Sequence, residues 1–154
     1  RQWDIAREPF AGTAALTDHL DATAGSLMWL AACALGAPPE AEPVIRAAGR
    51  ASGLAAWLRA TPALIARGRQ PLPDTSEAAI AALATEALNT LASARKNRGR
   101  VPKSALPALL TGWQTTHILR LAAAKPARVA NGALTLSDFT RRRILATRGI
   151  TGRW

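Results

Sequence analysis

Asp18 and Asp21 are the first residues whose types and spacing could do chemistry, because two carboxylates lie three positions apart in a stretch that predicts a helix. Residues at i and i+3 share a helix face, and two carboxylates on one face could hold a divalent cation. Acidic side chains in the early turns of a helix are also favoured by the helix dipole, with no ligand needed. We favour the second interpretation for this pair.

His19, His117 and Cys33 are further residues with ligand or nucleophile chemistry. Neither histidine has a neighbouring His or Cys at zinc-ligand spacing, so we expect polar tips at a helix boundary or groove rather than a metal centre. Cys33 is the only cysteine, which excludes a disulfide framework. Its apolar surroundings predict a small buried side chain. The sequence contains no phosphate-cradling glycine-rich loop and no nucleophile elbow.

Three glycines, Gly25, Gly49 and Gly53, fall inside predicted helices. A glycine inside a helix costs about 1 kcal/mol relative to alanine. This cost suggests either close contact between helices or room for a ligand, and close packing is the interpretation that we favour. Gly25 and Gly53 are nevertheless candidates for the lining of a ligand site.

The chain carries a formal net charge of +10, which suggests an anionic partner such as nucleic acid, a lipid surface, a phosphorylated ligand or an acidic protein. An Arg-rich and Ala-rich composition without any partner is the alternative. Nucleic acid is disfavoured because the sequence has no helix-turn-helix and no RNA-binding aromatic signature. The basic stretches 95–100 and 141–143 are typical of solvated turns, although either could contact anionic lipid.

Helices must position all of these residues, because the chain is rich in Ala and Leu and has few β-branched runs. We predict one helix over 13–35, closed by Gly36 and the prolines that follow. A second helix begins near Glu42-Pro43, is kinked at Pro62 and leads into a loop over 68–74. The result is an all-α fold in a single domain, 1–154.

The second half of the sequence predicts three more helices. Asp74 and Glu77 form a plausible capping box for a helix that Gly99 closes. The stretch 101–124 predicts one helix ended by Lys125-Pro126, and a turn at Asn131-Gly132 precedes a short helix capped near Ser137. No stretch is long and apolar enough for a membrane span, and no signal peptide is recognisable. We expect a cytoplasmic protein that could also associate peripherally with an inner membrane.

Three segments together resemble the squalene/phytoene synthase family: HLDATAGSLMWLAACALG from His19, GRASGLAAWLRATPALIARGRQPLP from Gly49, and SARKNRGRVPKSALPALL from Ser93. The resemblance implies an isoprenoid-synthase-like helical bundle around a cavity for prenyl diphosphates. It also implies that the chain corresponds to the C-terminal half of the family pattern, so that a first aspartate motif would lie upstream of Arg1. Such a half would leave apolar faces open for the missing half, a second copy or another subunit.

The second aspartate motif of the family, aligned on this resemblance, places its two Asp at Ala60 and Leu64. In active members these carboxylates hold Mg²⁺ against the diphosphate, so their loss implies no catalytic residue, no metal site and no cofactor here. Arg59, Arg67 and Arg69 are candidates for meeting a ligand phosphate at the cavity mouth. Another departure is His19-Leu20, where active members tend to carry Tyr-Cys.

The segments LRATP, from Leu58, and VPKSALPALL, from Val101, resemble the non-catalytic branch of that family that includes the mitochondrial complex I assembly factor and its bacterial relatives. This resemblance implies a binding or assembly protein, with a prenyl or lipid ligand, a respiratory-complex subunit or an anionic membrane surface as partner. The alternative is a Mg²⁺-dependent transferase that condenses prenyl diphosphates, which needs carboxylates from outside this chain.

Overall fold

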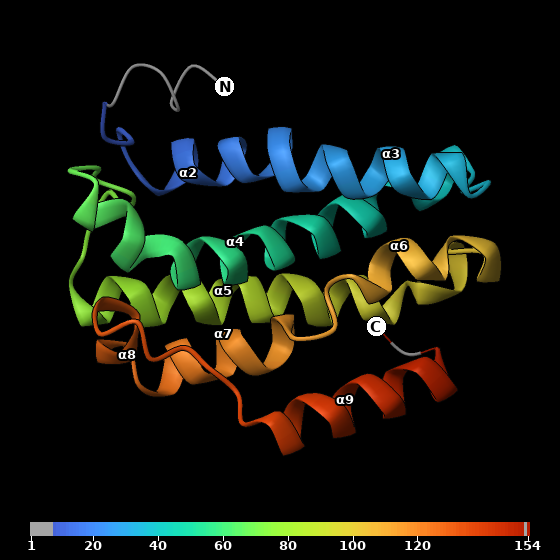
Figure 1. Ribbon diagram of the computed structural model, residues 1–154. Helices are drawn as coiled ribbons and strands as arrows, with labels where there is room; N and C mark the ends of the chain where they lie inside the picture. The colour runs from blue at the N-terminus through green and yellow to red at the C-terminus, as the bar shows by residue number, and fades with distance from the viewer. Residues whose placement is uncertain (1–7, 153) are drawn as a thin grey trace.

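The computed structural model describes residues 8–152 and 154, and every regular element among them is helical (Figure 1). The prediction of an all-α fold is confirmed. The larger helices lie side by side in the order of the chain, from α2 and α3 through α4, α5 and α7 to α9 (Figure 1). Short helices occupy the two ends of this arrangement, α6 at one and α8 at the other.

The predicted helix over 13–35 is continuous but contains a π-helical segment. It consists of α2 (Thr13–Leu20), the π segment η1 (Asp21–Gly25) and α3 (Ser26–Ala34). Gly36 ends it as predicted, with φ at 83° and its amide donating to the carbonyl of Cys33. The π segment is a finding that the sequence did not predict, and such insertions are frequent at functional sites.

The longest helix, α4 (Glu42–Ala66), also begins as predicted, with Pro43 in its first turn. Pro62 lies inside the helix without ending it. Gly68, at φ 71°, closes the helix, because its left-handed conformation lets the amide of Arg69 donate to the carbonyl of Leu64. The 3₁₀ turn η2 (Pro39–Ala41) precedes α4.

The next helix, α5 (Glu77–Lys96), has a different N-terminal cap from the one predicted. Oγ of Ser76 accepts from the amide of Ala79, while Asp74 accepts from the amide of Ser76 at 2.7 Å. The capping residue is therefore Ser76, and Asp74 shapes the turn that leads into it. The 3₁₀ turns η3 (Arg98–Arg100) and η4 (Lys103–Ala105) follow.

The prediction of a single helix over 101–124 was wrong, because the structure breaks it near Gly112. The pieces are α6 (Leu106–Leu110) and α7 (Thr115–Ala124), joined by a turn in which the amide of Gly112 donates to the carbonyl of Leu109. A Cβ at Gly112 would lie 3.3 Å from Oγ of Ser52, so this turn packs tightly on α4. The helices α8 (Ala127–Ala130) and α9 (Asp138–Thr151) complete the chain, with Ser137 capping α9 as predicted.

The core lies around α4, which contacts α5 on one side and the π segment and α3 on another, while α5 also packs on α7. Many core residues are alanines, so these helices approach closely. The prediction of a buried Cys33 was wrong, because the neighbouring Ala32 faces the core and Cys33 is exposed. Leu27 and Leu30 of α3 are also largely exposed, at 69% and 64%. None of the described helices combines the length and apolarity of a membrane-spanning segment.

Candidate functional site

The π segment and α4 meet through glycines. A Cβ on Gly49 would lie 2.8 Å from the carbonyl oxygen of Ala24, and a Cβ on Gly53 would lie 2.5 Å from Cβ of Ala24. Gly25 is buried, and a Cβ there would lie 2.9 Å from Oδ1 of Asp21. Real Cβ atoms do not approach other atoms so closely, so the two backbones are in contact because these residues lack side chains. Close packing therefore explains all three glycines.

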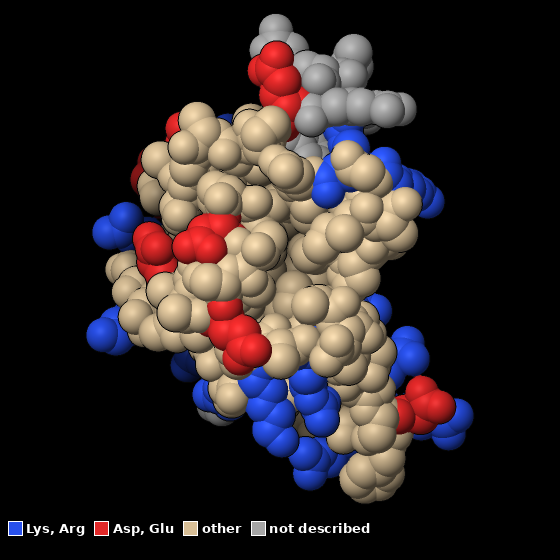
Figure 2. Space-filling model, turned by 90° about the vertical axis from the view of Figure 1, so that its left-hand side faces the viewer, with Lys and Arg blue, Asp and Glu red and all other residues tan. Residues whose placement is uncertain are grey.

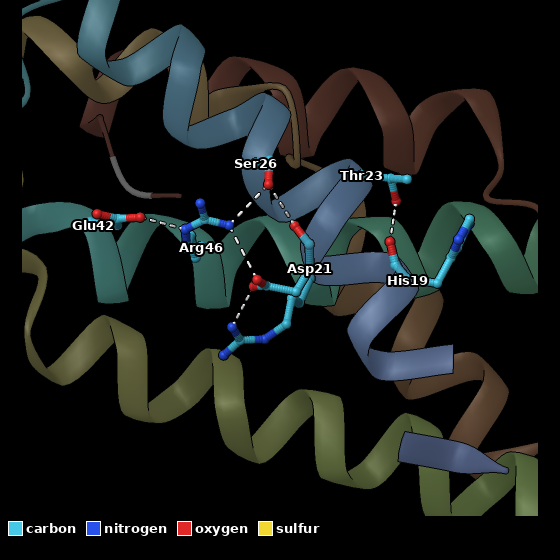
Figure 3. Close-up of polar contacts among 7 residues, drawn as sticks. His19, Asp21, Thr23, Ser26, Glu42 and Arg46 are labelled. Carbon is cyan, nitrogen blue, oxygen red and sulfur yellow. Dashed lines mark hydrogen bonds and ion pairs between the residues drawn. The ribbon is translucent and has the colours of Figure 1, made fainter. Parts of the chain in front are cut away.

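Asp21 is held by two arginines of α4, Arg46 and Arg50, and Figure 3 shows Arg46 beside the π segment. Its Oδ1 lies 2.7 Å from Nη1 of Arg50, and its Oδ2 lies 3.1 Å from Nη1 of Arg46. Glu42 also pairs with Arg46, and this hydrogen bond is the main reason why the pKa of Arg46 is raised. Asp21 thus serves an ion-pair network, while Asp18 is exposed and makes no ion pair within residues 8–152.

Ser26 satisfies the backbone where the helix widens. Its Oγ donates to the carbonyl of Asp21 at 3.1 Å and accepts from Arg46 at 3.0 Å (Figure 3). Thr23 likewise donates to the carbonyl of His19 at 2.7 Å. These side chains stabilise the π geometry by hydrogen-bonding carbonyls of the widened turn.

On the other side of the π segment, a groove of about 650 Å³ runs between this helix and α4. It is lined by small and apolar residues and by two larger rings, those of His19 and Trp57. Within residues 8–152, the lining residues are His19, Leu20, Ala22, Thr23, Ala24, Leu27, Gly53, Ala56, Trp57 and Ala60. No Asp or Glu is among these residues, and the volume lies in the range of small-molecule sites.

Three rings cluster beside the groove. His19 and Trp57 have ring centroids 5.3 Å apart, and Phe10 lies 5.3 Å from His19 and 5.9 Å from Trp57. Indole Nε1 of Trp57 donates to the carbonyl of Pro71 at 2.8 Å, which fixes the ring against the loop after α4. Edge contacts of this kind hold aromatic rings in defined orientations. The cluster gives the groove a rigid wall.

The structure brings two of the predicted site residues to this groove, Gly53 and Ala60. Gly25 is not among its lining residues. Leu64 is half-buried one turn beyond Ala60, in the last turn of α4. Sequence reasoning missed Trp57, although the spacing of positions 53, 57 and 60 places these residues on one helix face. It noted His19 as a departure from the family pattern without linking it to α4.

The donor set does not fit the magnesium ion that active members of the family use. The two positions expected to carry carboxylates hold a methyl and an isobutyl side chain, those of Ala60 and Leu64. Within residues 8–152 and 154, no three His, Cys, Asp or Glu side chains form a group that could hold a metal ion. Magnesium requires oxygen ligands, so the described residues support no reaction step through this metal.

The three predicted phosphate-binding arginines do not converge. Arg59 is exposed and lines a separate pocket of about 130 Å³ between α4 and the turn before α7. Arg67 is exposed and follows Ala66, the last residue of α4. Arg69 is half-buried and, like Arg67, is not among the residues that line the 650 Å³ groove.

Fold and groove together define an all-α helical protein with an apolar groove beside a π segment, a fold consistent with the helical architecture of isoprenoid synthases. In comparison with known families, residues 1–76 match the family described as squalene/phytoene synthase. This range includes Gly25, Gly53, Ala60 and Leu64, whereas the resembling segment from Ser93 lies outside it. No curated protein and no solved structure matches the chain significantly.

Proposed function

We propose that this chain is a non-catalytic member of the squalene/phytoene synthase family and that its groove binds a prenyl or lipid chain. The observation that carries the proposal is the lining of the 650 Å³ groove, which includes Ala60 and to which no described residue contributes a carboxylate. Ionisation of a diphosphate ester in this family depends on magnesium held by carboxylates, and this helix face offers none.

Apolar chemistry of the lining favours a hydrocarbon chain as the ligand. Leu20, Leu27 and the face of Trp57 provide apolar surface, and burial of such surface contributes about 25 cal/mol per Å². Thr23 uses its hydroxyl proton on the carbonyl of His19, so its polar group is already satisfied. The groove therefore favours binding of an unsubstituted hydrocarbon chain over binding of a polar ligand.

Titration with farnesol, followed by the fluorescence of the protein and by calorimetry, tests this binding. Ala60→Phe places a ring in the groove, and we expect it to weaken farnesol binding about tenfold or more, because the site is filled. Ala63→Phe is the matched control, since Ala63 is also exposed on α4 but does not line the groove. Farnesol binding that is absent, or equally weakened by both variants, contradicts the proposal.

The proposal extends to docking on a subunit of respiratory complex I. Its support is the resemblance of the segments from Leu58 and Val101, together with the exposed Leu27 and Leu30 of α3. Exposed leucines on one helix are typical of surfaces that meet a partner. Co-purification with subunits of the peripheral arm, lost in a Leu27→Gln, Leu30→Gln variant that keeps its Tm, is the expected result. If that variant co-purifies unchanged, α3 is not part of the interface. If the original protein does not co-purify with these subunits, they are not its partner.

A further inference from the structure

A further cavity, of about 730 Å³, lies between α9 and the C-terminal end of α5. It shares no lining residue with the groove beside the π segment. Its lining comes from α5, the turn after it, α6, α7, α9 and the residues that follow α9. Among the described residues it consists of Arg95, Arg98, Gly99, Val101, Leu106, His117, Arg143, Ile144, Thr147, Arg148, Thr151, Gly152 and Trp154.

Cationic side chains dominate this wall. Among the described residues, four arginines line the cavity, Arg95 and Arg98 from α5 and the turn after it and Arg143 and Arg148 from α9, and no Asp or Glu of that part of the chain is in the lining. In Figure 2, Lys and Arg gather over the lower part of the molecule, which is the part where α9 lies in Figure 1. Like charges that converge raise the free energy of the folded chain.

Arg95 shows this cost most clearly. Burial lowers its pKa to about 10, with further contributions from Arg148 and Arg120. Its Nη2 donates to Oγ1 of Thr116 at 2.9 Å, and its guanidinium lies 5.9 Å from the centroid of the Trp154 ring. Nε of Arg95, however, is buried and has no hydrogen-bond partner among the described residues. An unmet buried donor is costly, and an acceptor bound in the cavity would satisfy it.

His117, on α7, lies close to the same arginines. Its pKa is lowered by burial and by the charges of Arg148, Arg120, Arg143 and Arg95. A neutral imidazole in this position can still donate one hydrogen bond to an anion. Much of the remaining wall is apolar, since Val101, Leu106, Ile144 and Trp154 line the cavity and are wholly or largely buried. The site therefore joins a cationic cluster to an apolar surface.

We propose that this cavity binds an organic phosphate, with the phosphate group between the arginines of α5 and α9 and an apolar part against Trp154 and Ile144. Arginine binds phosphate oxygens through paired N–H groups, and a phosphate at this point neutralises the converging charges. The phosphate group is common to soluble phosphate esters and to phospholipid headgroups, and the experiment separates these two sources. The inference does not depend on the groove or on its ligand.

The probes are octyl phosphate in solution, inorganic phosphate, and vesicles containing phosphatidic acid. We expect octyl phosphate or the vesicles to bind, octyl phosphate to bind more tightly than inorganic phosphate, and binding to raise the Tm. Arg143→Gln should weaken binding about tenfold, because a charge-assisted hydrogen bond is lost. Arg142→Gln is the matched control, since Arg142 is the exposed neighbour on α9 and does not line the cavity. We expect less than about a twofold change for this variant, because a solvated surface charge contributes little.

Two further measurements keep the test decisive. The resonance of the Arg95 Nε–H group should shift when octyl phosphate binds, which reports contact at the buried donor directly and needs no variant. Binding of vesicles without octyl phosphate binding assigns the site to lipid headgroups, and the reverse assigns it to soluble esters. The proposal is overturned if neither probe binds, if Arg142→Gln and Arg143→Gln weaken binding equally, or if binding leaves the Arg95 resonance unchanged.

Discussion

Nη1 of Arg50 lies 2.7 Å from Oδ1 of Asp21, so the π segment is fastened to the middle of α4 by a carboxylate that it carries itself. Arg46, one turn earlier on α4, reaches Oδ2 of the same carboxylate. This arrangement fixes the helix that forms one wall of the groove against the helix that forms the other. The carboxylate that looked most available for a metal therefore has a structural role.

Asp21→Asn should lower the Tm. The change keeps the shape of the side chain but leaves Arg46 and Arg50 as like charges one turn apart without their shared anion. The deficit should shrink as salt is added, because salt screens partly exposed charges. Asp18→Asn is the control and should leave the Tm nearly unchanged. Equal changes in Tm for the two substitutions would show that the ion pairs of Asp21 do not stabilise the fold.

Gly53→Ala should destabilise the protein by about 1–2 kcal/mol, because the added methyl group would lie 2.5 Å from Cβ of Ala24 and forces α4 away from the π segment. Gly149→Ala is the control, since Gly149 lies within α9 and an added Cβ meets nothing within 4 Å. That substitution should stabilise the protein by up to about 1 kcal/mol through helix propensity.

The same contact predicts a rescue. Ala24→Gly removes the methyl group that collides with the one added by Gly53→Ala, so the double substitution should lose less stability than the sum of the two single ones. Denaturant unfolding of the original protein, both single variants and the double variant measures this coupling. Additive free energies would show that the two helices do not meet at these positions.

Ser76→Ala should cost about 1 kcal/mol, because Oγ of Ser76 caps the first turn of α5. Thr75→Ala, at the exposed position before it, should cost little. Unfolding in urea measures both variants. A larger loss for Thr75→Ala than for Ser76→Ala would place the cap elsewhere.

Stability should fall as the pH drops from neutrality through 6.5, the ordinary pKa of histidine. Burial and the surrounding arginines lower the pKa of His117 in the folded chain, so the unfolded chain binds more protons in this range. His117→Gln should flatten this dependence, and an NMR titration of His117 should give a midpoint below 6.5. A midpoint at or above 6.5, or an unchanged dependence in the variant, would contradict the packing described around α7.

Much of the fold was predictable because its signals are local. Pro43 and Gly68 mark the ends of α4, Gly36 ends α3, and Ser137 caps α9. The break near Gly112 was not predictable from propensity, because it depends on packing of the turn against Ser52 of α4. The π segment was not predictable either, because it involves contacts between helices: Asp21 is held by two arginines of α4.

In the candidate sites, too, only features that lie on one helix could be predicted from the sequence. Gly53 and Ala60 could be placed together because they lie seven positions apart on one helix. The contribution of His19 to the groove could not be predicted, because it depends on the packing of α2 against α4. The cationic cavity could not be predicted either, because the stretch 95–100 and the arginines of α9 are far apart in the sequence. Only the fold brings Arg95 and Arg143 to one cavity.

Release of diphosphate from farnesyl diphosphate in the presence of Mg²⁺ tests the central claim most directly. Because the family resemblance places the metal-binding carboxylates at Ala60 and Leu64, the purified protein should release diphosphate no faster than buffer, while farnesol still binds to the groove. Release that depends on both the protein and Mg²⁺, and that stops when the metal is chelated, would contradict the account of a binding protein without catalysis.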